Sequence, residues 1–241
     1  MNLKQSDQLE IKARRERFSI SMRRSENELH FSAFRKRVML SDSNSVSMAE
    51  LGEQCDPEKL MHFCYLQKTL KEAIAADDLP DILRYLRIIA GTLADITDVE
   101  YAPINELFES NLNEQIFVIL RNDKLLKNPS IVKEAVSIIS NASAGKKAQI
   151  EVLIQMGMFP LFKDILRDGD QHSTYNVLFS LANILCEDSM FKRKFDEAGL
   201  WSVIFEAVER YRFIARVAQV SVWLFSSAIS KDPFLNHNTV D

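Results

Sequence analysis

From residue 56 onward, apolar residues recur with the spacing of amphipathic helices, and no segment shows the alternation of a half-buried strand. The segment EAVSIISNASAGKKAQIEVLIQMGMFPL (134–161) reads as an apolar helix, a short polar break and a second apolar helix. The first predicted helix, DPEKLMHFCYLQKTLKEAIAA, has Asp56 as a suitable cap and Pro57 in its first turn. The pattern therefore predicts an all-α chain.

The helical pattern repeats after about 42 residues. This shift superposes EVLIQMGMFPLFKDIL on RKFDEAGLWSVIFEAV and places Gly157 on Gly199. The same shift superposes EAVSIISNAS on NVLFSLANIL and places Asn141 on Asn183. Paired apolar helices with this period are typical of armadillo and HEAT repeats, which stack into a solenoid with a long concave face. The alternative is an ordinary helical bundle with accidental internal similarity.

A shift of 46 residues extends the repeat toward the N-terminus, because it superposes PINELFESNLNEQIFVIL on QIEVLIQMGMFPLFKDIL. Asn111 then stands where the next unit has Gly157. Asn is the residue that best replaces Gly in a left-handed turn, so the exchange predicts a left-handed residue at both positions.

The repeat also suggests a role for the amides of Asn141 and Asn183. If the last helix of each unit lines the concave groove, both carboxamides can donate to and accept from the backbone of an extended peptide. The residues one helical turn earlier share that face, where an aromatic ring can stack on the stem of a Lys or Arg. These residues are Ser137, Phe179 and Trp223. The alternative is that the amides merely end helices and the aromatic rings belong to the core.

These segments resemble the importin-alpha nuclear import adaptors, whose groove helices carry a pattern close to E-A-x-W-x-x-S-N-x-x-x-G, then Q-I/T and G-x-x-P-x-L/F. EAVSIISNASAG…QI…MGMFPLF fits with Ser137 in place of Trp, and NVLFSLANIL fits with Phe179 in that place. VSVWLFSS keeps Trp223 but has Ser227 in place of Asn. The resemblance covers roughly residues 66–232 and implies a right-handed armadillo solenoid of about four repeats, the first degenerate. Only the half that carries the major groove of the family is expected.

The resemblance also implies a groove that binds the basic nuclear localisation signals of cargo proteins. Glu187 stands where the family has an acidic residue that meets a signal lysine. The expected peptide-binding residues are Asn141, Asn183, Phe179, Trp223, Glu187, Ser137, Ser227 and Asn176.

Charge is distributed unevenly along the chain. Residues 1–40 contain ten Lys or Arg and five Asp or Glu, a net of +5, and the remainder carries −9, which gives the overall −4. Such an arm suits an acidic partner or its own acidic body. RRERFSISMRRSENELHFSAFRKRV (14–38) resembles the importin-beta-binding segment of the same family, although ENE replaces its middle basic pair. The matching residues are Arg14, Arg15, Arg17, Arg23, Arg24, Arg35, Lys36 and Arg37.

Little in the sequence points to catalysis. There is no glycine-rich phosphate loop, nucleophile elbow or metal-ligand spacing, and we expect no cofactor, metal or small-molecule substrate. No apolar run is long enough to cross a membrane, and the N-terminus lacks a secretory signal. Three widely spaced cysteines suit reduced thiols rather than a disulfide framework. The four scattered histidines are expected to be surface or incidental residues: His30, His62, His172 and His237.

The predicted organisation is a basic arm (1–40), a linker (41–55) and armadillo repeats (56–241). The predicted function is a non-enzymatic nuclear import adaptor of the cytoplasm and nucleus, which binds basic signals in its groove and importin-beta through its arm. One alternative is a truncated paralogue that binds importin-beta but no cargo. Another is an armadillo scaffold outside transport, whose basic arm binds nucleic acid. A short basic arm of this kind also occurs as a membrane-surface helix, but the resemblance favours importin-beta.

Overall fold

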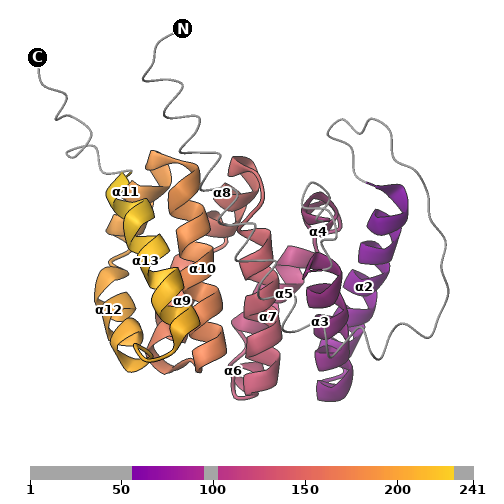
Figure 1. The fold of residues 1–241 in the computed structure, drawn as a ribbon. Coiled ribbons are helices and arrows are strands. Elements are labelled where there is room, and N and C mark those ends of the chain that lie inside the picture. The colour runs from indigo at the N-terminus through magenta and orange to yellow at the C-terminus, as the bar shows by residue number, and fades with distance from the viewer. Residues whose placement is uncertain (1–55, 95–102, 231–241) are drawn as a thin grey trace, which may run out of the picture. The chain divides into compact units, whose positions relative to one another are not determined.

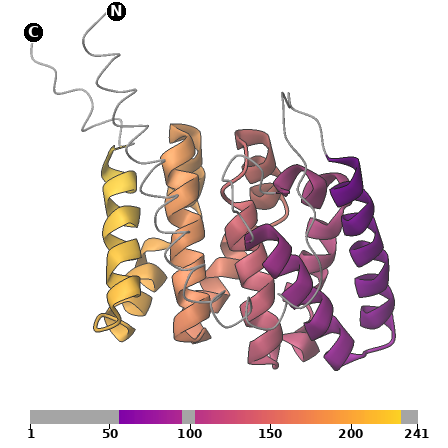
Figure 2. The same cartoon turned by 45° about the vertical axis from the view of Figure 1, so that its right-hand side comes forward.

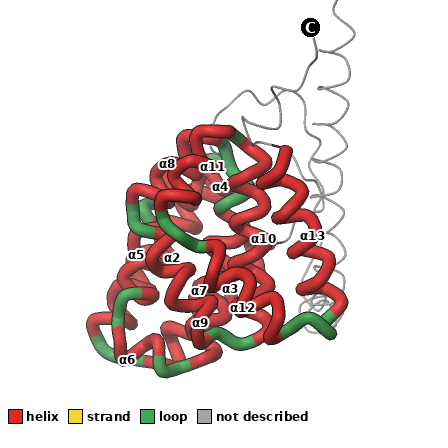
Figure 3. The backbone as a smooth tube through the Cα atoms, turned by 90° about the vertical axis from the view of Figure 1, so that its left-hand side faces the viewer, coloured by secondary structure: helices red, strands yellow, loops and turns green. Residues whose placement is uncertain are grey.

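The computed structural model describes residues 56–94 and 103–230, and these residues form helices joined by turns and short loops (Figures 1 and 3). No strand occurs within these ranges, so the all-α prediction is confirmed. The segments Asp56–Leu93 and Pro103 onward belong to one compact unit. The predicted arm and linker lie outside the described residues.

This compact part of the chain begins with a pair of helices. Three repeat units follow, and each of them ends in a long helix. The first pair is α2 (Pro57–Ala75) and α3 (Leu79–Ala94). The first unit contains α4 (Ile104–Glu109), α5 (Leu112–Leu120), the single turn α6 (Asp123–Leu126) and α7 (Pro129–Ala142). The second contains α8 (Lys147–Gln155), α9 (Met158–Asp168) and α10 (Gln171–Glu187). The third contains α11 (Ser189–Glu197), α12 (Trp201–Arg210) and α13 (Ala215–Ser230).

The last helices of the three units lie side by side, with α10 packed between α7 and α13 (Figures 1 and 2). This is the order that the 42-residue period predicted, and it is confirmed. Because α10 has a neighbour on either side, every residue from Ser173 to Leu185 is buried. Asn176 and Asn183 are among these buried residues. Because their amides have little access to solvent, they must find hydrogen-bond partners within the fold.

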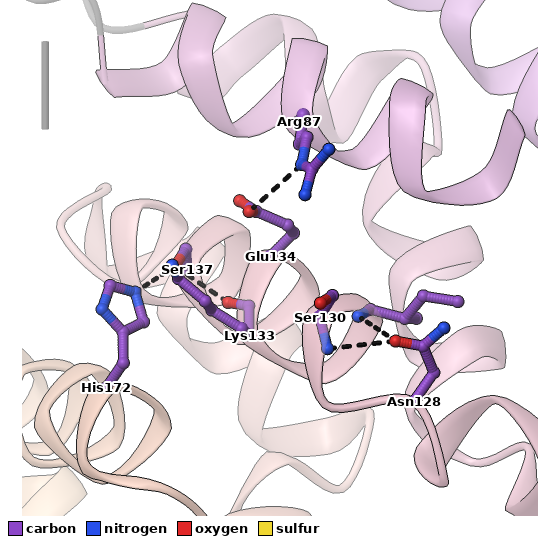
Figure 4. A network of polar contacts seen from close by, with 8 residues as sticks. Arg87, Asn128, Ser130, Lys133, Glu134, Ser137 and His172 are labelled. Carbon is purple, nitrogen blue, oxygen red and sulfur yellow. Dashed lines mark hydrogen bonds and ion pairs between the residues drawn. The ribbon is translucent and has the colours of Figure 1, made fainter. Parts of the chain in front are cut away.

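Side chains fix the starts of several helices, and the predicted cap at Asp56 is confirmed. Asp56 accepts hydrogen bonds from the backbone N–H groups of Glu58 and Lys59 at 2.9 and 3.3 Å, and Pro57 opens α2. Asn128 caps α7 in the same way (Figure 4), and Asp170 caps α10. These caps satisfy N–H groups that have no partner inside the helix, so each helix begins at a defined residue.

The turn before the middle helix of each unit has the same backbone conformation. Asn111, Gly157 and Gly199 have φ angles of 56°, 83° and 62°, all in the left-handed region. The prediction that Asn111 replaces a left-handed glycine is therefore confirmed. Since all three units turn at the same point, the sequence shifts of 46 and 42 residues correspond to real structural equivalence.

Candidate functional site

The predicted peptide-binding residues lie on α7, α10 and α13, and side-chain contacts link the three helices into one row. Contacts from Ser137 and Ser143 join α7 to α10. Contacts from Phe179 and Cys186 join α10 to α13. The sequence pattern therefore marks residues that the fold brings together, although most of them are more enclosed than expected.

Ser137 is the centre of the polar contacts between α7 and α10 (Figure 4). Its hydroxyl donates to the carbonyl of Lys133 at 2.9 Å, so its oxygen is left to accept. The amide Nδ2 of Asn176 donates to that oxygen at 2.9 Å, and Nε2 of His172 lies 3.3 Å from it. The expectation that His172 is incidental was wrong, because the first turn of α10 places its ring beside the Ser137 hydroxyl.

The amide of Asn183 is enclosed, whereas that of Asn141 is more accessible. Asn183 is 7% exposed, and its Nδ2 donates to Oγ of Ser143 at 3.3 Å. The repeat predicted that both carboxamides line the groove, but that of Asn183 is enclosed, because α10 lies between two other long helices. Asn141 is half-buried, and its amide makes no hydrogen bond to another described residue.

Aromatic rings continue the row from α10 to α13. The ring of Phe179 lies 5.9 Å from that of Tyr175 and meets Trp223 edge to face at 5.2 Å. The guanidinium carbon of Arg216 lies 5.5 Å from the centre of the Tyr175 ring. Within the protein, a cation therefore already lies over one ring of this row. Sequence reasoning missed Tyr175 and Arg216, although Tyr175 stands one helical turn before Phe179 and could have been found from that spacing.

Ser227, which stands where the repeat pattern expects an Asn, has an internal role. Its hydroxyl donates to the carbonyl of Trp223 at 2.8 Å, and Sγ of Cys186 lies 2.9 Å from its oxygen. The side chain is buried in this contact between α10 and α13. A short hydroxyl in this position cannot reach a peptide backbone as a carboxamide would.

Two acidic residues at the end of α10 have different environments. Glu187 is exposed, as its predicted role requires. Asp188 accepts from the N–H of Met190 and from Nζ of Lys147, both at 2.7 Å, so it caps α11 and ties it to the start of α8. The hydrogen bond and charge of Asp188 raise the pKa of Lys147 above its ordinary value. Near the other end of the row, Arg87 of α3 pairs with Glu134 of α7 at 3.7 Å (Figure 4).

Within the described ranges, neither a cluster of potential metal ligands nor a membrane-spanning helix is found. No three His, Cys, Asp or Glu side chains of these ranges come close enough to hold a metal ion. None of the helices described is long and apolar enough to span a bilayer. The residues expected to contact importin-beta all precede residue 56, so their positions are outside what the structure describes.

Comparison with known proteins identifies the fold. No family model matches the chain. The designed armadillo repeat protein YIII(Dq)4CqI is similar in structure, with a TM-score of 0.57, 20% sequence identity and coverage of 70% of this chain and 68% of its own. A second designed armadillo protein, YIII(Dq.V1)4CPAF in complex with peptide (KR)4, has a TM-score of 0.54 and 22% sequence identity, and the match covers 69% of this chain and 64% of that protein. A structure of computationally designed armadillo repeat proteins for modular peptide recognition has a TM-score of 0.54 and 22% sequence identity, and the match covers 73% of this chain and 69% of that chain. The protein is an armadillo-repeat solenoid.

Proposed function

We propose that this armadillo solenoid binds an extended basic peptide along the row formed by α7, α10 and α13, and that it acts as a nuclear import adaptor of the importin-alpha type. The observation that carries the proposal is that equivalent positions of consecutive long helices carry amides on α7 and α10, at Asn141 and Asn183, and aromatic rings on α10 and α13, at Phe179 and Trp223. Such an alignment repeats the same chemistry at regular steps, which matches the regular spacing of an extended peptide.

The residues of the row suit the two parts of a basic peptide. The half-buried Asn141 offers a carboxamide to the peptide backbone. We propose that Phe179 and Trp223, whose rings meet edge to face and are 4% and 6% exposed, stack on cationic side chains of the peptide, and Arg216 over Tyr175 is an internal example of that contact. Exposed Glu187 adds a negative charge at one end of the row. The complex of a designed armadillo protein with a (KR)4 peptide supports a basic ligand for this fold.

The adaptor role rests on the sequence of the arm together with the fold. The body is acidic, with a net charge of −9 beyond residue 40, and the arm is basic. We propose importin-beta as the partner of the arm and shuttling between cytoplasm and nucleus as its consequence. The resemblance of residues 14–38 to an importin-beta-binding segment supports this assignment.

Fluorescence anisotropy with a labelled Lys-rich signal peptide tests peptide binding, and an acidic peptide of equal length provides the ligand control. Asn141→Ala and Glu187→Ala should each weaken binding several-fold. The matched control is Glu206→Ala, which removes an exposed acidic residue from α12, away from the row. The urea midpoint of each variant shows whether a loss of binding reflects a loss of folding.

A pull-down with importin-beta separates the adaptor from the alternatives. Binding of importin-beta together with the basic peptide supports the adaptor. Binding of importin-beta without any peptide binding, even at high concentration, would favour the truncated regulator. Binding of neither, with salt-sensitive affinity for nucleic acid, would favour the scaffold outside transport.

A further inference from the structure

The outer stripe of α13 is exposed and carries no charge. Val222 and Ile229 are 68% and 58% exposed, and the other members of the stripe are exposed as well. At intervals of three or four residues, the stripe consists of Ala215, Gln219, Val222, Ser226 and Ile229. Charged residues make up 27% of the chain, so a fully exposed helix face without any charge is unusual for this protein.

The fold buries the C-terminal part of this stripe, the positions of Val222, Ser226 and Ile229, at its two earlier occurrences. With Trp223 aligned on Phe179, the positions of Val222, Ser226 and Ile229 correspond to α10 residues that are fully buried. The corresponding α7 residues are no more than 3% exposed. In α10 these residues are Leu178, Ala182 and Leu185, and in the first unit they are Val136 and Ser140 of α7 and Ser143, which follows its last residue. Since the following long helix packs beside each of them, the stripe is the face through which one long helix receives the next.

Stacked aromatic rings border the α13 stripe. The ring of Phe225 lies 5.6 Å from that of Phe205 at 24° and 6.1 Å from that of Trp201 at 30°. Phe205 on α12 is itself 57% exposed. The stripe and these rings lie on neighbouring helices, α12 and α13, and we call them together the terminal face.

We propose that the terminal face binds the terminal face of a second copy of this chain across a two-fold axis. The pattern of the stripe supports this occupant, because its alternation of apolar and polar residues is the same read in either direction. In an antiparallel pair of α13 helices centred on Val222, that residue meets its own copy. Gln219 then lies opposite Ser226 and Ala215 opposite Ile229, so polar residues meet polar ones and apolar residues meet apolar ones.

Charge and size are consistent with a weak, symmetric dimer. When a surface pairs with its own copy, any charge near the two-fold axis meets a like charge. The stripe carries no charge, so its self-pairing avoids this repulsion. With 16 residues, α13 is about 24 Å long, and two helices are about 20 Å wide, so each copy contributes roughly 500 Å². Interfaces of that size belong to the small class, so the dimer should form in the micromolar range.

Sedimentation equilibrium of the full chain from about 1 µM to about 200 µM measures the proposed dimer. We expect a monomer–dimer equilibrium that stops at the dimer. Val222→Asp should raise the dissociation constant at least about tenfold, because the two-fold axis brings the new carboxylates together. Tyr65→Asp is the matched control, since it changes an equally exposed apolar residue on α2, and it should leave the dimer unchanged. Circular dichroism should show the same helix content in all three proteins.

A cysteine at the axis distinguishes the proposed geometry from other modes of association. Under mild oxidation, Val222→Cys should form a disulfide-linked dimer faster than wild type, whose own cysteines report unrelated links. A wild-type chain that stays monomeric throughout the range would overturn the proposal and assign the terminal face to a different occupant. A dimer that survives Val222→Asp, or growth beyond the dimer, would overturn it too, since each requires another interface.

Discussion

Substitution of Gly199 by Ala should destabilise the protein by the cost of a left-handed backbone alone. At this position φ is 62°, and an added β-carbon would meet only Nζ of Lys163 at 3.8 Å, an ordinary contact. No clash adds to the penalty, so we expect a loss of about 1–2 kcal/mol. For a chain of this size, that loss corresponds to a fall in Tm of roughly 2–8 °C.

A control of opposite sign is available in α3. Gly91 lies inside this helix, its φ is not left-handed, and nothing lies within 4 Å of a built β-carbon. Gly91→Ala should therefore stabilise the protein by about 0.5–1 kcal/mol, since Ala is the better helix former. The same exchange of Gly for Ala thus raises stability at one position and lowers it at the other.

Asn111 extends the test to the first unit. Asn111→Ala should cost about 1 kcal/mol, whereas Asn111→Gly should be close to neutral, because Gly keeps the left-handed turn. Urea unfolding followed by circular dichroism, with thermal scans on the same samples, measures all four variants. If Gly199→Ala proved neutral or stabilising, or if Asn111→Ala behaved like Asn111→Gly, the equivalence of the units would fail. The alignment of Asn141 with Asn183 would fail with it.

Three further predictions concern binding and charge. A Lys-rich peptide should bind roughly ten- to a thousandfold more weakly than to an armadillo protein that has both the Trp and the Asn in every repeat. Each lost cation stack costs about 0.5–2 kcal/mol, and the Asn missing at Ser227 costs about 1 kcal/mol. Anisotropy titration of both proteins with the same peptide checks this. Calorimetry should show importin-beta binding abolished when Ala replaces Arg14, Arg15, Arg17, Arg23 and Arg24, and unchanged affinity would give the arm another role. The raised pKa of Lys147 implies that its pair with Asp188 stabilises the fold below pH 10.5 and is lost as pH rises through the raised pKa. As pH rises through that pKa, the Tm of Lys147→Met should therefore fall less than the Tm of wild type, which thermal unfolding measures.

The sequence by itself determined the repeating architecture of this protein. The apolar spacing, the caps at Asp56 and Asn128 and the left-handed residue shared by Asn111 and Gly157 are local features, and each acts within a few residues of itself. Local features recurring at a fixed interval are enough to define a solenoid, because each unit contacts mainly its neighbours. For the same reason, the sequence also identified which residues of successive units would be equivalent.

The tertiary structure alone decided how open each of those residues is. Whether an amide such as Asn183 faces solvent or a neighbouring helix depends on the packing of α10 between α7 and α13, which no single helix encodes. The contact of His172 with Ser137 and that of Arg216 with Tyr175 join residues 35 and 41 positions apart, so periodicity within one helix could not reveal them. Within the described residues, α13 leaves Val222, Ser226 and Ile229 exposed, although the equivalent positions of α7 and α10 are buried. Exposure is a property of what packs alongside a helix, whereas the pattern belongs to the helix itself.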